Sequence, residues 1–140
     1  MSTTNNSPDP RTDPKALIRD EFDGIQGTVV HLSNRQDVDV VVTTGGTGVT
    51  TDDVTPEAIE PILDKQLPGF GEEFRRRSVD EIGPMGIVSR ALAGVAEGVV
   101  VVCLPGSESA ARTGMALLQS VVGHLVALAA EGEQEDEERV

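Results

Sequence analysis

The stretch that decides the fold is VDVVVTTGGTGVTTDDVTPEA, residues 38–58, which reads as a strand, a glycine-rich turn and the start of a helix. Residues 38–44 are rich in β-branched side chains and alternate little between apolar and polar positions, as expected of a strand covered on both faces. We therefore predict a central, parallel strand here. Thr55 and Pro56 suit the cap and the first position of the following helix, and Glu57 lies in its first turn, where the helix dipole favours an acid.

The segments around this stretch repeat the alternation of helix and strand. A second continuous apolar run, VVVVCL at residues 99–104, is bounded by Gly and by Pro-Gly and predicts another buried strand. Pro61 is expected to interrupt the helix that begins at Thr55. The other predicted elements are a modest edge strand over residues 90–95 and helices over residues 23–35, 69–78 and 109–130. This order predicts an α/β fold, a three-layer α/β/α domain with a mostly parallel sheet.

Charge excludes several classes of partner. The formal net charge of the 140 residues is -13 and the pI is near 4.4, which opposes binding to nucleic acid or to an anionic membrane surface. Lysine occurs only at Lys15 and Lys65, while the other nine of the 11 basic residues are arginine, and acids are spread along the chain. This composition resembles proteins of salt-loving microbes, whose cytoplasm screens such self-repulsion. We expect stability to fall sharply in dilute buffer.

The sequence also predicts the bounds of the folded domain and the cellular location of the protein. Cys103 is the single cysteine and lies in an apolar run, so we expect a small buried residue rather than a nucleophile, and no disulfide. No signal-peptide or membrane-span pattern is visible, which favours a cytoplasmic protein. Residues 1–15 are polar and are expected to form a disordered arm, and residues 131–140 to form an acidic disordered tail, which leaves residues 16–130 as the folded domain.

The loops after the two predicted buried strands are the first places to look for a site, because open α/β sheets bind ligands at the carboxyl ends of their strands. The turn at residues 45–48 holds three glycines, which let backbone N–H groups approach a phosphate. Such turns also need glycine for steric reasons alone. Asp52 and Asp53 strengthen the functional interpretation, because one carboxylate can cap the next helix while the other holds a metal ion.

Five motifs in order carry a resemblance to a known family. TTGGTG at residues 43–48 is followed by DDVTPEA, PGFGEEFR at residues 68–75, SR at residues 89–90 and LPGS at residues 104–107. In order and spacing they resemble the MoaB/MogA family of molybdenum cofactor biosynthesis proteins, over about residues 16–130. Relatives of the CinA type would have GGLG, and those of the MoeA type GGVS, at residues 45–48.

This resemblance implies an activity and a site. The activity is the adenylylation of molybdopterin by ATP with Mg²⁺, which releases pyrophosphate before molybdate or tungstate is inserted. Asp53 would bind magnesium, and Asp20 would position metal or substrate, although without the resemblance Asp20 reads as one more surface acid. The resemblance also implies a homo-oligomer, such as a trimer or hexamer. The other implied residues hold nucleotide phosphates (Thr44, Gly45, Gly46, Thr47, Gly48) or face the pterin or its phosphate (Ser89, Arg90, Pro105, Gly106, Ser107).

The chain departs from the family pattern at its start. Family members begin with an apolar strand that ends in a Ser-Asp/Asn-Arg type turn, then a loop, a helix and a second strand, whereas only polar sequence precedes Ala16 here. The missing first strand would lie beside residues 38–44, so we expect unpaired backbone groups and uncovered apolar surface there. Three explanations are open: an internal start in a longer gene, which we favour, a decayed paralogue, or closure of the gap by another copy.

Two other functions stay open beside the adenylyltransferase. One is a non-catalytic module of the same pathway, which holds molybdopterin or associates with intact MoaB subunits and is inactive because the first segment is missing. The other is an unrelated nucleotide-binding α/β domain, which would bind ATP with no response to the pterin.

Overall fold

The computed structural model describes residues 21–138 of the chain, so Asp20 and the predicted arm lie outside the described residues. Helices and strands alternate along the described part, as the sequence predicts. Short 3-10 helices, labelled η, follow two of the α-helices. In chain order the elements are α1 (Phe22–Ser33), β1 (Val40–Thr44), α2 (Thr55–Ile59), η1 (Glu60–Ile62), β2 (Lys65–Gln66), α3 (Pro68–Ile82), η2 (Pro84–Val88), β3 (Leu92–Ala96), β4 (Val99–Leu104) and α4 (Glu108–Glu138).

The sheet has the strand order β1-β4-β3-β2. β1 and β4 are parallel, whereas β4 with β3 and β3 with β2 are antiparallel. The α/β class is confirmed, but the described sheet is mixed rather than mostly parallel. The reason is the two-residue turn Glu97-Gly98, where φ is 51° and 76°, the left-handed pair that joins adjacent antiparallel strands. β3 is therefore an inner strand, and the edge strand predicted at residues 90–95 is wrong in its position.

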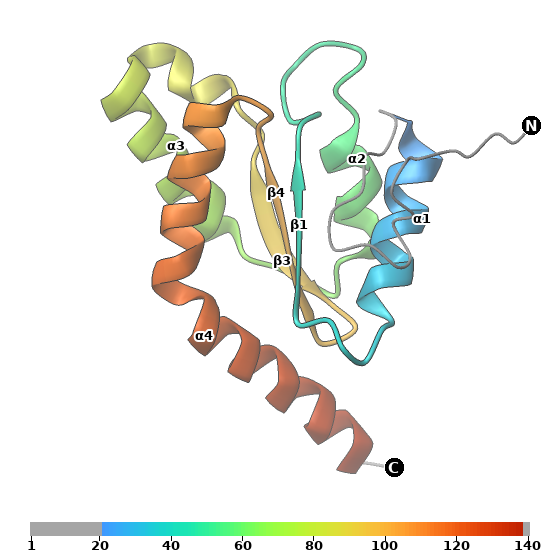
Figure 1. Cartoon of the computed structure of the whole chain (residues 1–140). Helices are drawn as coiled ribbons and strands as arrows, with labels where there is room; N and C mark the ends of the chain where they lie inside the picture. Colours follow the sequence, from blue (N-terminus) through green and yellow to red (C-terminus); the bar gives the residue numbers. More distant parts are fainter. Residues whose placement is uncertain (1–20, 139–140) are drawn as a thin grey trace, which may run out of the picture.

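Two helical layers enclose this sheet, with α1 and α2 on one face and α3 and α4 on the other (Figure 1). The alternation of β4 explains the layers, because all six of its residues are buried and successive side chains enter opposite cores. Val100, Val102 and Leu104 pack with Phe70, Phe74 and the α4 leucines. Val99, Val101 and Cys103 pack with α1 and α2. The three-layer expectation and the expected burial of Cys103 are confirmed.

The helix boundaries differ from the sequence predictions at two places. The helix predicted to end near Ala130 continues to Glu138, through most of the predicted acidic tail. Its first 24 residues, Glu108–Glu131, are long and apolar enough by composition to span a membrane, contrary to the expectation that no such segment occurs. Leu117 and Leu118 of this helix are buried against the sheet, so we interpret α4 as a core helix.

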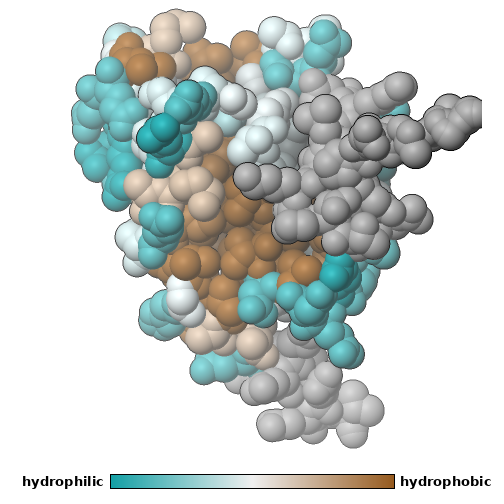
Figure 2. Space-filling model, in the orientation of Figure 1, coloured by the Kyte–Doolittle hydropathy of each residue, from teal (hydrophilic) through white to brown (hydrophobic). Residues whose placement is uncertain are grey.

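β1 is an edge strand within the described residues, which corrects the prediction of a central strand. The carbonyl of Asp39 accepts from Val100 N–H, and Gly45 N–H donates to Leu104 O. Because backbone groups alternate in direction, Val40, Val42 and Thr44 point theirs away from β4. Val42 is 36% exposed although Val102, its partner in register, is 0% exposed. Figure 2 shows a hydrophobic area over the middle of this side of the molecule, as expected for an uncovered edge.

Candidate functional site

The carboxyl ends of the two parallel strands bring the predicted loops together. Gly45 N–H donates to Leu104 O over 2.8 Å, so the turn after β1 begins in contact with the loop after β4. A Cβ placed on Gly106 would lie 3.4 Å from the Cα of Gly45. The glycine turn and the LPGS loop therefore form one surface at this end of the sheet, where ligands of α/β folds bind.

Thr55 fixes the glycine turn. Its hydroxyl donates to Gly45 O over 3.0 Å, and its N–H donates to Gly46 O over 3.1 Å. Thr55 is the first residue of α2 rather than its cap; the cap residue is Val54, and no side chain caps this helix. The sequence interpretation of Thr55, and of one aspartate, as a helix cap is therefore wrong, because the Thr55 hydroxyl bonds the glycine turn and the Asp53 carboxylate accepts from Thr50.

The backbone of the turn has a left-handed conformation, and its Thr47 side is buried. Gly45 and Gly46 have φ of 105° and 73°, a left-handed conformation that strongly favours glycine. In residues 21–138 the N–H groups of Gly46 and Thr47 have no acceptor, whereas that of Gly45 is used by Leu104. Successive amides in such a turn make a concavity that binds phosphate oxygens. Thr44 is exposed at the end of β1, beside this turn.

The carboxylate of Asp53 points back toward the turn. Its Oδ2 accepts from Thr50 N–H over 2.9 Å and from the Thr50 hydroxyl over 2.8 Å. A Cβ on Gly48 would lie only 2.6 Å from this oxygen, so glycine is needed for the approach. The hydrogen bonds from Thr50, and the nearby Arg90, lower the pKa of Asp53 below its usual 3.8. Asp53 is therefore charged at neutral pH. Its side chain is partly buried, whereas that of Asp52 is exposed.

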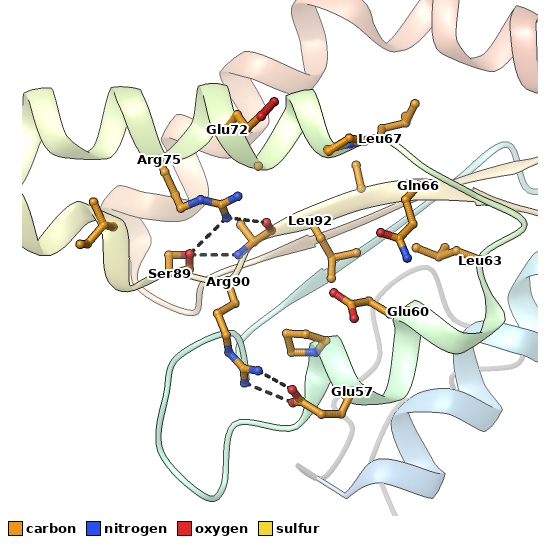
Figure 3. Close-up of a pocket in the computed structure, with 16 residues that line it drawn as sticks. Glu57, Glu60, Leu63, Gln66, Leu67, Glu72, Arg75, Ser89, Arg90 and Leu92 are labelled. Carbon is orange, nitrogen blue, oxygen red and sulfur yellow. Dashed lines mark hydrogen bonds and ion pairs between the residues drawn. The ribbon is translucent and has the colours of Figure 1, made fainter.

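Arg90 anchors both ends of the loop that carries Asp53. Its N–H donates to Thr47 O over 2.8 Å, its Nε to Gly48 O over 2.7 Å and its Nη2 to Asp53 O over 2.8 Å. The same guanidinium pairs with the Glu57 carboxylate on α2 (Figure 3). This pair lowers the pKa of Glu57 and raises that of Arg90. The sequence placed Arg90 against substrate, whereas here the guanidinium contacts the loop.

Two hollows meet at the Arg90–Glu57 pair. A shallow one of about 360 Å³ is lined by Asp53 and by the loop before α2. A larger one of about 550 Å³ extends toward β3 and α3 and is drawn in Figure 3. Arg90 and Glu57 line both, so the ion pair forms the wall between them.

The serines of the other two motifs accept hydrogen bonds from backbone N–H groups close to them in the sequence. The Ser89 hydroxyl oxygen accepts from Ala91 N–H over 3.3 Å, and the Ser107 hydroxyl oxygen accepts from Ala110 N–H at the start of α4, also over 3.3 Å. Ser107 and Gly106 are exposed, and Pro105 is partly exposed, so this loop is open to a ligand. The structure brings residues 105–107 to the glycine turn.

The other charged groups have mainly structural partners. Arg76 pairs with Glu73 and Asp80, and Arg77 also pairs with Glu73, which lowers the pKa of Glu73 to about 2. Arg76 and Arg77 are therefore partners of carboxylates on their own helix. No cluster of three or more His, Cys, Asp or Glu that could hold a metal occurs among the described residues.

Comparisons with known proteins identify the family. A family model described as a probable molybdopterin binding domain matches residues 12–124, most of the chain. The chain belongs to this molybdopterin-binding family. Within it, the chain is similar to proteins of the MoaB/MogA type, as the motifs indicate, and the expected resemblance is confirmed.

Several members of the molybdopterin-binding family are similar over most of this chain. A protein of Methanocaldococcus jannaschii named probable molybdopterin adenylyltransferase is 40% identical over 116 residues, 83% of this chain and 71% of that protein. A Bacillus cereus molybdenum cofactor biosynthesis protein B is 42% identical over 78% of this chain and 66% of its own length. A crystal structure of a molybdenum cofactor biosynthesis protein B superposes with a TM-score of 0.78 at 40% identity, over 81% of this chain and 72% of that one. This chain therefore spans about two thirds of its relatives.

Proposed function

We propose that this chain takes part in molybdenum or tungsten cofactor biosynthesis as a molybdopterin adenylyltransferase. The observation that carries the proposal is the charged Asp53 carboxylate against Gly48, beside a turn whose Gly46 and Thr47 amides have no acceptor within residues 21–138. A relative from Pyrococcus furiosus, 49% identical over 63% of this chain and 54% of its own length, is named molybdopterin adenylyltransferase. In this proposal the surface would join a phosphate-binding turn to the carboxylate of Asp53.

In the proposed reaction an oxygen of the molybdopterin phosphate attacks the α-phosphorus of ATP. A new P–O bond forms, the bond from the α-phosphorus to its bridging oxygen breaks, and pyrophosphate leaves. The protein forms no covalent bond in this step, so its task is to align the two phosphates and balance their charge. The amides of Gly46 and Thr47 would hold nucleotide phosphate oxygens. Thr44 at the end of β1 would assist them, and the open loop of residues 105–107, together with Ser89, would hold the pterin or its phosphate.

Magnesium fits this donor set as a partner of the nucleotide. Mg²⁺ in such enzymes is usually held by one or two carboxylates together with substrate phosphates, rather than by a cage of protein ligands. Asp53 has a lowered pKa and supplies one such carboxylate. When bound, the ion would neutralise charge on the triphosphate. We propose Asp20, which lies outside the described residues, as a second acid of the site.

A non-catalytic module of the same pathway is the second candidate. It is favoured by one observation, the outer edge of β1. Within the described residues no strand pairs with this edge, and Val42 is exposed there. Such a module would bind molybdopterin without transferring adenylate. For either function we propose a cytoplasmic location and a homo-oligomer.

Pyrophosphate release separates these functions. The protein is incubated with molybdopterin, ATP and Mg²⁺ in high salt, and pyrophosphate is measured over time. Release that requires molybdopterin and is lost in Asp53→Asn supports the enzyme, and Asp52→Asn is the matched control because its exposed carboxylate is adjacent. Molybdopterin binding without release supports the module. ATP binding that ignores the pterin would contradict both and favour an unrelated nucleotide-binding domain.

A further inference from the structure

The PGFGEEFR motif at residues 68–75 has no part in the proposed chemistry, yet it lies behind the segment that carries Arg90. Arg75 of α3 reaches over this segment, and its Nη1 donates to Ser89 O over 3.3 Å and to Ala91 O over 3.1 Å (Figure 3). The two carbonyls flank Arg90 on either side. A single guanidinium therefore fixes the backbone from which the Arg90 side chain starts.

Gly71, one helical turn before Arg75, makes this approach possible. A Cβ on Gly71 would lie 2.7 Å from Ala91 O and 2.7 Å from Nη2 of Arg75. Both are closer than real Cβ contacts allow, and the neighbour at Ala91 is backbone that cannot rotate away. Only glycine at position 71 lets the Arg75 guanidinium lie between α3 and the segment before β3.

The contacts continue from there to the loop of Asp53. Arg90 N–H, Nε and Nη2 donate to the carbonyls of Thr47, Gly48 and Asp53. The Arg90 guanidinium also pairs with Glu57, so the loop is tied to α2 as well. Movement of the Arg90 backbone would shift the loop at both of its ends.

We infer that Gly71 and Arg75 are positioning residues, which act through Arg90 to hold the loop of residues 48–53 and thus set Asp53 relative to the glycine turn. The consequence for catalysis rests on the proposed function. The effect on the loop does not, because the chain of hydrogen bonds exists whatever the loop binds. Displacement of a positioned group by about 1 Å is enough to slow a reaction by roughly a hundredfold.

The test compares Arg75→Gln with Arg76→Gln. Arg76 is the next residue on the same helix, but within residues 21–138 its guanidinium pairs with the carboxylates of Glu73 and Asp80 on that helix and not with the segment of Arg90. Hydrogen exchange is measured at the amides of Thr50, Asp53 and Thr55, all of which donate hydrogen bonds in this loop. We expect Arg75→Gln to speed exchange there by about tenfold or more, with little change in α4, and Arg76→Gln to leave it unchanged.

Two further variants and one kinetic measurement complete the test. Arg75→Lys should restore part of the protection because an ammonium can donate to the same carbonyls, and Gly71→Ala should lose protection as Arg75→Gln does. If the chain is the proposed enzyme, kcat should fall by about tenfold or more in Arg75→Gln at saturating ATP, with Arg76→Gln normal. Equal loop exchange in both glutamine variants would overturn the inference. Failure of wild-type pyrophosphate release would overturn only the proposed function.

Discussion

The hydroxyl of Thr55 occupies the space that a Cβ on Gly46 would need, so the start of α2 and the glycine turn fit only if position 46 has no side chain. The same hydroxyl donates to Gly45 O, and the Thr55 N–H donates to Gly46 O. Gly46 also has a φ of 73°. Steric and conformational requirements therefore coincide at the residue whose amide is proposed to bind phosphate.

Gly46→Ala should destabilise the protein and weaken nucleotide binding. The positive φ alone costs about 1 kcal/mol or more for a side-chain residue, and the contact with Thr55 adds to it. Urea unfolding measures the loss, and titration with Mg-ATP measures binding. Gly27→Ala is the control, because a Cβ there meets nothing within 4 Å and alanine favours the helix. Equal stability of the two variants would contradict this account of the turn.

Val102→Ala and Val42→Ala should differ although the two residues are partners in register. Val102 is fully buried between the sheet and the layer of α3 and α4, so its truncation should cost about 2 kcal/mol. Val42 is partly exposed at the sheet edge, and the same change should cost less than about 1 kcal/mol. Denaturant unfolding compares them. A loss at Val42 as large as that at Val102 would mean that this edge is covered in solution.

The buried strands could be predicted because burial on both faces leaves a continuous apolar run, as in VVVVCL of β4. The position of β3 could not, because its pairing depends on the turn Glu97-Gly98, and Glu-Gly is a weaker hairpin signal than Asn-Gly or Asp-Gly. The apolar run of β1 by itself indicates a central strand. The uncovered edge was expected only from the family pattern, which places a further strand beside residues 38–44.

The residues of the site also differ in how far they could be predicted, because some depend on local sequence and others on contacts between distant segments. Gly45, Gly46, Gly48 and Asp53 are close in sequence, so composition and spacing indicate them. Arg90 and Gly48 are 42 positions apart, and no local pattern states that an arginine will donate to that carbonyl. Arg90 was found through the family motif but with a substrate-facing role. Its hydrogen bonds to loop carbonyls became visible only from the folded backbone.

Cys103 should resist thiol reagents in the folded protein. The side chain is fully buried in β4, and burial raises its pKa to about 11. The thiolate that such reagents need is therefore scarce as well as inaccessible. Reaction with a disulfide reagent should be very slow in native buffer and rapid in denaturant. Rapid labelling of the native protein would contradict the burial of this strand.

Salt should stabilise the fold, as the composition predicts. With a formal net charge of -13, the folded chain brings like charges together that dilute buffer does not screen. At about 1 M salt the screening length falls to about 3 Å, so this repulsion is largely removed. We expect the thermal midpoint to rise markedly between dilute buffer and molar KCl. A midpoint that is high and independent of salt would count against adaptation to a saline cytoplasm.

The ion pair of Glu57 and Arg90 should make the loop sensitive to acid. Arg90 lowers the pKa of Glu57 from its usual 4.5, so the folded state binds this proton less readily than the unfolded chain. The stabilisation is therefore complete above pH 4.5 and is lost as the pH falls through the lowered value. The pair is half exposed, so the effect on global stability is small.

Loop exchange is the more sensitive measurement of this pair. Protection at Thr50 and Asp53 should fall as Glu57 becomes protonated, and Glu57→Gln should show the weaker protection at every pH. In Arg90→Gln the Glu57 carboxyl should titrate at a higher pH by NMR, because the guanidinium that favours its charged form is gone. If Glu57 titrates identically in the wild type and in Arg90→Gln, the ion pair does not form in solution, and Arg90 anchors the loop through the carbonyls of Thr47, Gly48 and Asp53 without it.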